Sequence, residues 1–156
     1  MTAITSRELV RRDLPQVISI SRENMATIIF TSWGVEYRDE DLLQFLLDPS
    51  AFTEVLEEDG RIVAYYSVEE RNENLYINSI QVQKGHQGQG LGREMMERIE
   101  ARARSGGLRG IELWVQVTNR SAMEFYRHLG YHMVSRQGNN YLMRLRLDPR
   151  EGWRLV

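Results

Sequence analysis

The distribution of hydrophobic and polar positions divides the chain into a series of short predicted elements. Alternation over a few residues predicts a half-buried strand, and hydrophobic residues spaced by three or four predict an amphipathic helix. Strands are predicted over residues 4–10, 52–57, 61–68, 75–82, 111–117, 131–136 and 141–147. Helices are predicted over residues 14–29, 39–47, 91–105 and 119–129.

Residues with special backbone properties mark the ends of several of these elements. Asp13 precedes the first helix as a predicted cap, and Gly34 breaks that helix. Pro49 ends the second helix, because proline cannot continue one. Gly130 follows the last helix as a left-handed C′ residue. The turn Glu58-Asp59-Gly60 predicts a hairpin between its flanking strands.

The order of the elements, β-α-α-β-β-β-α-β-α-β-β, predicts the fold class. Helices interspersed among runs of strands are typical of an α/β (α+β) domain, here with a mixed, mostly antiparallel central sheet flanked by helices. A chain of 156 residues is expected to form one domain. We assign residues 1–147 to that single domain and residues 148–156 to a C-terminal tail.

Composition narrows the possible functions. A formal net charge of −2 gives no general attraction to nucleic acid or to an acidic membrane surface. The absence of cysteine excludes disulfides and thiolate metal sites, and the three histidines lack metal-ligand spacing, so no metal is expected. No apolar run reaches membrane-spanning length, and the N-terminus has no signal-peptide pattern. These features favour a cytoplasmic protein.

A glycine-rich loop between a strand and a helix is the most informative segment. Gly85, Gly88, Gly90 and Gly92 follow the strand 75–82, and a helical pattern begins at once. The first N–H groups of a helix have no partner within the helix, and the helix dipole is positive there. Glycines also let the backbone approach a phosphate closely. The segment therefore predicts an anion site, most naturally for a pyrophosphate.

The spacing of the loop decides between kinds of phosphate ligand. It fits neither the dinucleotide fingerprint G-x-G-x-x-G nor the P-loop, which needs a lysine after its glycines. The pattern Gln87-x-x-Gly90-x-Gly92 instead resembles the pyrophosphate-binding loop of the GNAT (N-acetyltransferase) superfamily. In that superfamily the loop holds acetyl-coenzyme A. A plain glycine turn is the structural alternative at this point.

A second segment carries the same resemblance. The run from Asn119 to Tyr131 resembles the N-x-x-A-x-x-F-Y-x-x-L-G-F helix of the GNAT superfamily, at the usual distance after the loop. Ala122, Phe125 and Leu129 fall on one helical face, as an amphipathic helix requires. The resemblance covers about residues 50–147, while residues 1–50 match only in length and general pattern.

The resemblance implies acetyl-CoA as cofactor and a set of residues that bind it. The glycine loop would hold the pyrophosphate, and the preceding strand and Asn119 would hold the pantetheine arm. In the family a bulge splays the central strands, and such a bulge frees backbone groups for a ligand. The expected cofactor-binding residues are Ile80, Gln81, Val82, Gln87, Gly88, Gln89, Gly90, Leu91, Gly92, Arg93 and Asn119. Asn119 is equally expected to be the N-cap of its helix.

Tyr126 is the expected catalytic residue, because it matches the family's tyrosine that protonates the leaving thiolate. The ordinary pKa of tyrosine, ~10, is close to that of an alkyl thiol, so the proton transfer would be nearly balanced. A core tyrosine packed beside Phe125 is the structural alternative.

The general base is not evident from the sequence. Many relatives have a glutamate in the strand before the glycine loop, where this chain has Asn74, and others have one in the next strand, at the position of Trp114. Glu112 and Glu73 are weak candidates that would act through water. Each is more often a solvated carboxylate than a base.

A site without a strong base suits a weakly basic acceptor. An α-amine with a pKa of ~7.8 is roughly a quarter free base at pH ~7.4, whereas a lysine amine with a pKa of ~10.4 is about 0.1% free. We therefore expect a peptide N-terminus or a small-molecule amine in preference to a lysine side chain. The acceptor wall is expected within residues 22–47, where Glu36, Asp39, Glu40 and Asp41 form an acidic cluster.

Three functions are compatible with the sequence. The first is N-acetyl transfer from acetyl-CoA directly to a primary amine. The second is an acyl-CoA-binding sensor or scaffold without catalysis. The third, a partner-binding module without cofactor, leaves the loop from Gln87 to Gly92 unexplained. A homodimer is possible, and neither the acceptor nor the acyl chain length is fixed by a motif.

Overall fold

The computed structural model describes residues 3–147, so the expected tail at 148–156 lies outside the described residues. The helices are α1 Leu14–Trp33, α2 Asp39–Leu46, α3 Leu91–Ser105 and α4 Arg120–His128. The strands are β1 Thr5–Glu8, β2 Phe52–Glu58, β3 Arg61–Arg71, β4 Asn74–Val82, β5 Gly110–Gln116, β6 His132–Gln137 and β7 Asn140–Arg146. Two 3-10 turns, η1 Arg11–Asp13 and η2 Lys84–His86, precede α1 and the glycine loop. The predicted element order is confirmed.

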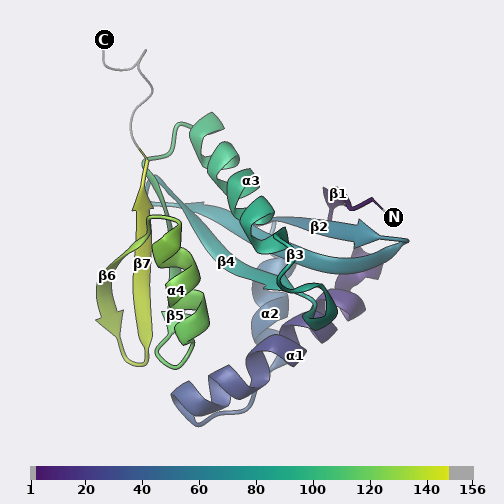
Figure 1. Cartoon of the computed structure of the whole chain (residues 1–156), viewed down its shortest axis with the longest axis horizontal. Coiled ribbons are helices and arrows are strands. Elements are labelled where there is room, and N and C mark those ends of the chain that lie inside the picture. Colours follow the sequence, from purple (N-terminus) through teal and green to yellow (C-terminus); the bar gives the residue numbers. More distant parts are fainter. Residues whose placement is uncertain (1–2, 148–156) are drawn as a thin grey trace.

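The described strands form one sheet in the order β1-β2-β3-β4-β5-β7-β6. Neighbouring strands are antiparallel except β4 and β5, which run parallel. Helices α3 and α4 lie on one face of the sheet, and α1 and α2 lie on the other (Figure 1). The predicted mixed, mostly antiparallel sheet flanked by helices is therefore confirmed.

The two central strands diverge after a short paired stretch. β4 and β5 pair only from Asn74 opposite Gly110 to Tyr76 opposite Glu112. Directly beyond this point β4 carries an extra residue, because Ser67 pairs with Ser79 whereas Val68 pairs with Ile77. The bulge at Asn78 bends β4 away from β5, since a bulged strand kinks and twists locally. The bulge predicted for this strand is confirmed, and the strands separate as Figure 1 shows.

The sheet separates two hydrophobic cores. Leu56, Tyr66 and Val68 belong to the larger core, which packs against α3 and α4. Val55 and Tyr65 face the smaller core under α1 and α2. Because both faces of β3 are covered, its residues are buried without interruption from position 62 to position 68. No helix within residues 3–147 is long and apolar enough to cross a membrane.

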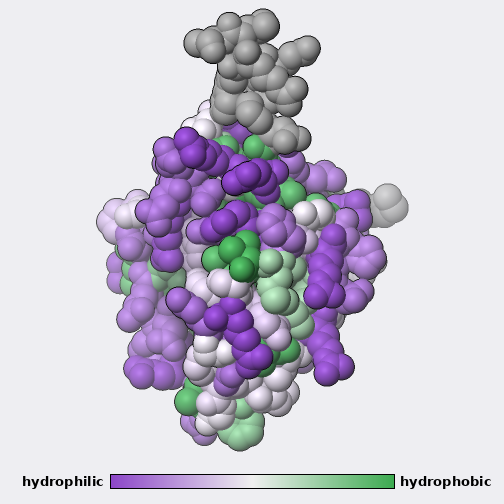
Figure 2. All heavy atoms as spheres, turned by 90° about the vertical axis from the view of Figure 1, so that its left-hand side faces the viewer, coloured by the Kyte–Doolittle hydropathy of each residue, from purple (hydrophilic) through white to green (hydrophobic). Residues whose placement is uncertain are grey.

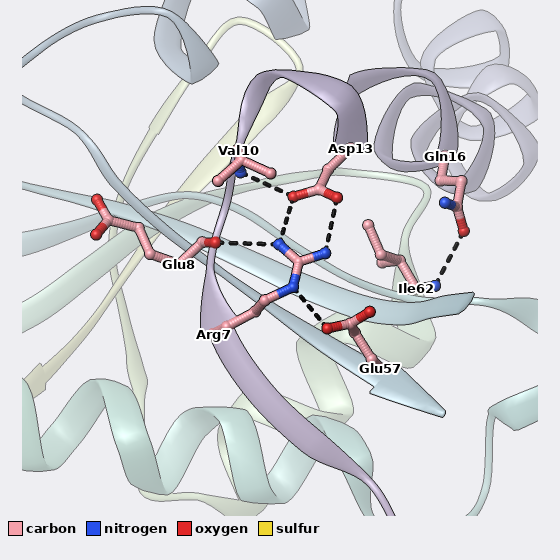
Figure 3. Close-up of polar contacts among 7 residues, drawn as sticks. All are labelled: Arg7, Glu8, Val10, Asp13, Gln16, Glu57 and Ile62. Atoms are coloured by element: carbon pink, nitrogen blue, oxygen red, sulfur yellow. Dashed lines mark hydrogen bonds and ion pairs between the residues drawn. The ribbon is translucent and has the colours of Figure 1, made fainter. Parts of the chain in front are cut away.

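The start of α1 is fixed to the sheet by side chains. Arg7 of β1 donates from both terminal nitrogens to the Asp13 carboxylate, at 2.7 and 2.8 Å, and from Nε to Glu57 at 2.5 Å (Figure 3). The Ile62 N–H donates to the side-chain oxygen of Gln16 at 3.0 Å. These contacts set the path of α1 across the sheet.

The predicted capping role of Asp13 is wrong. Its carboxylate accepts no hydrogen bond from the first turn of α1 and instead binds Arg7 and the N–H of Val10, at 2.8 Å to the latter. The first strand is consequently shorter than predicted, because the chain turns into η1 at Arg11. Helix α1 is four residues longer than predicted and continues to Gly34, whose φ of 69° ends it.

β6 is the edge strand at one end of the sheet, and all six of its residues are exposed. Figure 2 shows this side of the molecule as a largely hydrophilic surface with a few hydrophobic side chains. Met133 and Val134, each 41% exposed, are the large hydrophobic residues that β6 contributes to it.

Candidate active site

A cavity of about 1180 Å³ opens where β4 and β5 separate. It reaches both faces of the sheet. Its lining comes from the diverging halves of β4 and β5, from the glycine loop and the starts of α3 and α4, and from α1, α2 and their connection. Among the expected cofactor-binding residues all but Gln89, which is exposed, line this cavity, and so does Tyr126.

The glycine loop has the backbone that an anion site needs. Gly88 and Gly90 have φ values of 79° and 85°, in the left-handed region that favours glycine. Helix α3 begins at Leu91, directly after Gly90. A Cβ at Gly92 would lie 3.4 Å from the Phe125 ring, so α3 and α4 approach closely here. The first N–H groups of α3 therefore lie at the cavity wall, where they favour negative charge.

An asparagine of α1 joins the end of β4 to this loop. Asn24 donates to the side-chain oxygen of Gln81 at 3.1 Å and to the carbonyl of Val82 at 2.8 Å. Gln87 donates to the same Val82 carbonyl at 3.1 Å. Sequence reasoning missed Asn24, because nothing in the local pattern of α1 distinguishes it from a solvated polar residue.

Asn119 is the N-cap of α4, as predicted. Its side-chain oxygen accepts from the Ala122 N–H at 3.3 Å. The cap fixes the start of α4 at the cavity wall, directly after β5.

Tyr126 lies in the wall of the cavity and is only 5% exposed. Its ring packs against Phe125 and Tyr131, with centroid distances of 5.3 and 5.7 Å. Burial raises the pKa of its hydroxyl, because the phenolate would lose its hydration. Tyr126 is therefore held as the neutral phenol, the form that can donate a proton.

Neither candidate base lies in the cavity wall. Glu112 binds Arg144, with contacts of 3.1 and 2.8 Å to one carboxylate oxygen. Glu73 is in the turn before β4, 68% exposed in its side chain, with Arg109 at 3.3 Å. The carboxylates that do line the cavity are Glu36 and Asp41, both on the α1–α2 side.

Hydroxyl and indole groups complete that side of the cavity. Ser79, next to the bulge, shares a hydrogen bond of 2.9 Å with Tyr65, and burial raises the pKa of Tyr65 to about 12. The Tyr37 hydroxyl is buried near Ser21 of α1, and this burial raises its pKa above the ordinary value of 10. Tyr37 and Trp114 line the cavity from the α1–α2 connection and from β5. This side offers polar groups that a second, smaller ligand can use.

Comparison with known proteins agrees with this geometry. An N-acetyltransferase encoded in the pepI 3′ region of Lactobacillus delbrueckii subsp. lactis is 26% identical over 151 residues, covering 83% of this chain and 85% of the relative. The PaiA N-acetyltransferase of Thermoplasma acidophilum, solved in complex with coenzyme A, superposes with a TM-score of 0.77 at 15% identity over 93% of this chain and 99% of its own.

The ribosomal-protein-S18-alanine N-acetyltransferase of Escherichia coli has a TM-score of 0.76 at 19% identity, over 96% of this chain and 98% of its own. At these identities the likeness shows the fold alone. The sequence model of the acetyltransferase (GNAT) family matches residues 17–131, most of the described chain. The chain is therefore an acyltransferase of the acetyltransferase (GNAT) family.

Proposed function

We propose that this protein transfers an acetyl group from acetyl-CoA directly to the nitrogen of a primary amine. The observation that carries the proposal is a single cavity that joins the glycine loop, the bulged end of β4 and Tyr126 to the polar α1–α2 side. The coenzyme A complex of the Thermoplasma acidophilum relative supports the choice of cofactor.

The residues present fit coenzyme A. Gly88 and Gly90 have open space where a Cβ would stand, so a phosphate can approach the N–H groups at the start of α3. Beyond Tyr76, β4 has no β5 neighbour along its free side. The Val82 carbonyl there accepts from Asn24 and Gln87, and the other backbone groups of this side are left for the amides of a pantetheine arm. When bound, acetyl-CoA supplies the acetyl thioester.

Tyr126 supplies the proton that the reaction needs. As the amine nitrogen bonds to the acetyl carbon, the carbon–sulfur bond breaks and the sulfur takes the hydroxyl proton of Tyr126. The amine loses one proton to water, and Tyr126 regains one from solvent, so the proton count balances. Burial raises the pKa of Tyr126 above the ordinary value on which the expected near-balance with a thiol rests, so the transfer is favourable only to a thiolate whose own pKa is raised by the same buried site.

The acceptor is expected on the α1–α2 side. A weakly basic amine, at a peptide N-terminus or on a small molecule, reaches the site partly as free base. Glu36 and Asp41, with Arg38 between them, give this side of the cavity a small excess of negative charge, which favours an approaching ammonium ion.

Thiol release from acetyl-CoA tests the proposal. The amine panel contains N-terminal peptides, lysine peptides, polyamines, amino acids and aminoglycosides. We expect turnover with one class, and the same product mass as authentic N-acetyl amine. A rise in melting temperature with coenzyme A, but no turnover with any amine, would favour a non-catalytic acyl-CoA sensor. Within residues 3–147 no carboxylate of β4 or β5 lines the gap between these strands, and this observation supports the second function.

A further inference from the structure

The C-terminal end of α1 forms hydrogen bonds with two segments that are distant in sequence. The hydroxyl oxygens of Thr31 and Ser32 lie 3.0 and 2.6 Å from that of Thr118, in the connection between β5 and α4. Thr118 also donates to the carbonyl of Ile28 at 3.4 Å. We call this group of contacts, together with those of the next paragraph, the clasp.

The β6–β7 turn forms the second half of the clasp. Asn139 donates from its side-chain nitrogen to the carbonyl of Ser32 at 2.6 Å, and Trp33 donates from its indole N–H to Asn140 at 3.3 Å. The Trp33 ring covers Gly138 so closely that a Cβ there would lie 2.6 Å from it. The clasp therefore joins α1 to the turn by hydrogen bonds and by ring packing.

The clasp side chains do not themselves line the main cavity but lie next to it, and Trp33 is 44% exposed. A second pocket, of about 390 Å³, is lined by Trp33, Gly138 and Asn140, and Trp114 lines both this pocket and the main cavity. Gln116, which lines the main cavity, pairs across the sheet with Asn140. One strand spacing, about 4.8 Å, thus separates the cavity from the residues that hold Trp33.

We propose that the clasp is a fixed wall that limits the length of the acceptor, so that this protein acetylates small primary amines and excludes extended peptides. This inference rests on the proposed function and narrows its substrate class. An acceptor that extends from the cavity along β5 and β7 crosses Gln116 and then meets Asn140 and Trp33. The other end of α1 is held by the pair of Arg7 and Asp13, so the helix cannot swing aside without breaking contacts at one end.

A series of acceptors of increasing length tests the wall. The series runs from small amines through amino-acid amides to di-, tri- and hexapeptides with one common N-terminal residue. In the wild-type protein we expect kcat/KM to fall about tenfold or more from the amino-acid amide to the hexapeptide. Trp33→Ala opens the wall. In this variant we expect kcat/KM for the amino-acid amide and for the hexapeptide to differ by no more than about threefold, mainly because KM for the hexapeptide falls.

Phe30→Ala is the matched control, because Phe30 is 59% exposed on the same helix and takes no part in the clasp. It should keep the wild-type length profile. Asn139→Ala, which removes the bond to Ser32 without removing a ring, is a second opening variant in case Trp33→Ala folds poorly. An unchanged profile in both opening variants would overturn the wall.

A reversible cross-link separates a fixed wall from a moving lid. The Ser32 and Thr118 oxygens are 2.6 Å apart and the native chain has no cysteine, so Ser32→Cys with Thr118→Cys places two sulfurs near the ~2.05 Å of a disulfide. With product followed by mass spectrometry, we expect the oxidised protein to acetylate small amines as well as the reduced protein does. Loss of this activity on oxidation and its return with reductant would show a lid and contradict the proposal.

Calorimetric binding of the same acceptors in the presence of coenzyme A gives a readout without turnover. Binding that weakens with acceptor length in the wild-type protein, and not in Trp33→Ala, supports the wall. If no acceptor is acetylated at the same time, only the proposed transferase activity is contradicted. Turnover that is independent of acceptor length would leave the transferase and remove the wall. If no acceptor binds and none is acetylated, the result contradicts both the transferase function and the wall.

Discussion

The two faces of the sheet meet at one cavity but are built by different means. On the α3–α4 face the site consists of backbone groups: a glycine loop, the first turn of a helix and a bulged strand, with one tyrosine beside them. On the α1–α2 face it consists of side chains from α1, from α2 and the connection to it, and from β5. Most residues of the first face are close together in the sequence and form recognisable motifs. Those of the second face come from distant segments that only folding brings together.

This difference indicates which face suits a cofactor common to the family and which face can select an acceptor. Backbone groups can hold the same cofactor whatever side chains surround them, so the α3–α4 face suits a cofactor common to many enzymes. Side chains distinguish one acceptor from another. Variants on the α3–α4 face should therefore alter cofactor binding or chemistry, and variants on the other face should alter acceptor choice or the placement of α1.

The largest effect is expected for Tyr126→Phe. Without the hydroxyl, kcat should fall about 100-fold or more, whereas the affinity for coenzyme A should change by less than about twofold. Tyr131→Phe is the matched control, because Tyr131 is a buried neighbour whose hydroxyl has no hydrogen-bond partner among the described residues and does not line the cavity. Steady-state kinetics of both variants decide the point. If kcat falls equally in both variants, or falls in neither, Tyr126 has no role in the chemistry.

The next effect concerns the placement of α1. Asp13 is buried, and hydrogen bonds from Arg7 lower its pKa below the ordinary value of 3.8. Asp13→Asn should cost about 2 kcal/mol of unfolding free energy at pH 7. A carboxyl whose pKa is depressed by folding stabilises the folded state above its unfolded pKa, and this contribution is lost as the pH falls through the folded pKa. Denaturant unfolding should thus show the two proteins converging below pH 4, and a constant difference down to strongly acidic pH would contradict the ion pair's role.

Gly90→Ala probes the backbone of the α3–α4 face. Gly90 has a φ of 85°, and an alanine there is strained by about 1–2 kcal/mol and displaces the loop. We expect the affinity for coenzyme A, measured by calorimetry, to fall about tenfold. Gly60→Ala, at a φ of 75° in the β2–β3 turn, carries the same kind of strain away from the cavity. It should lower stability and leave affinity unchanged, and a similar loss of affinity in both variants would mean that the loop backbone has no direct role.

The smallest effect separates the two roles expected of Asn119. Asn119→Ala should cost about 1 kcal/mol of stability by removing the cap of α4, and Asn119→Ser should restore most of it, because serine also caps helices. Neither variant retains the side-chain amide. If that amide also contacts the pantetheine arm, coenzyme A affinity should fall in both variants alike. Affinity that recovers in Asn119→Ser would show that Asn119 acts only as a cap.

The sequence predicts the α3–α4 face well because its signals are local. Gly90 with the helix that follows it and the Asn119 cap depend on neighbouring residues, whereas the bulge in β4 is expected only from the resemblance to the family. The assignment of Asp13 as a helix cap is wrong because a distant partner, Arg7, competes for its carboxylate. Sequence patterns do not record such competition.

Contacts across long sequence separations lie beyond such reasoning. Asn24 meets Val82 over 58 positions, and Asn139 meets Ser32 over 107. Glu112, chosen as a candidate base from its place in β5, is held by Arg144 of a strand that is distant in sequence and adjacent in the sheet. These pairings follow from strand order and helix placement.

The two faces are proposed to contribute a cofactor site and an acceptor site to one cavity. A crystal structure with coenzyme A bound is the most direct test of this proposal. We expect the pyrophosphate at the N–H groups of residues 88–93, the pantetheine arm along the free side of β4, and the sulfur within about 3.5 Å of the Tyr126 hydroxyl. The α1–α2 side should remain open to an amine. Coenzyme A bound with its sulfur on the α1–α2 side, or away from Tyr126, would show that the two faces do not divide cofactor and acceptor in this way.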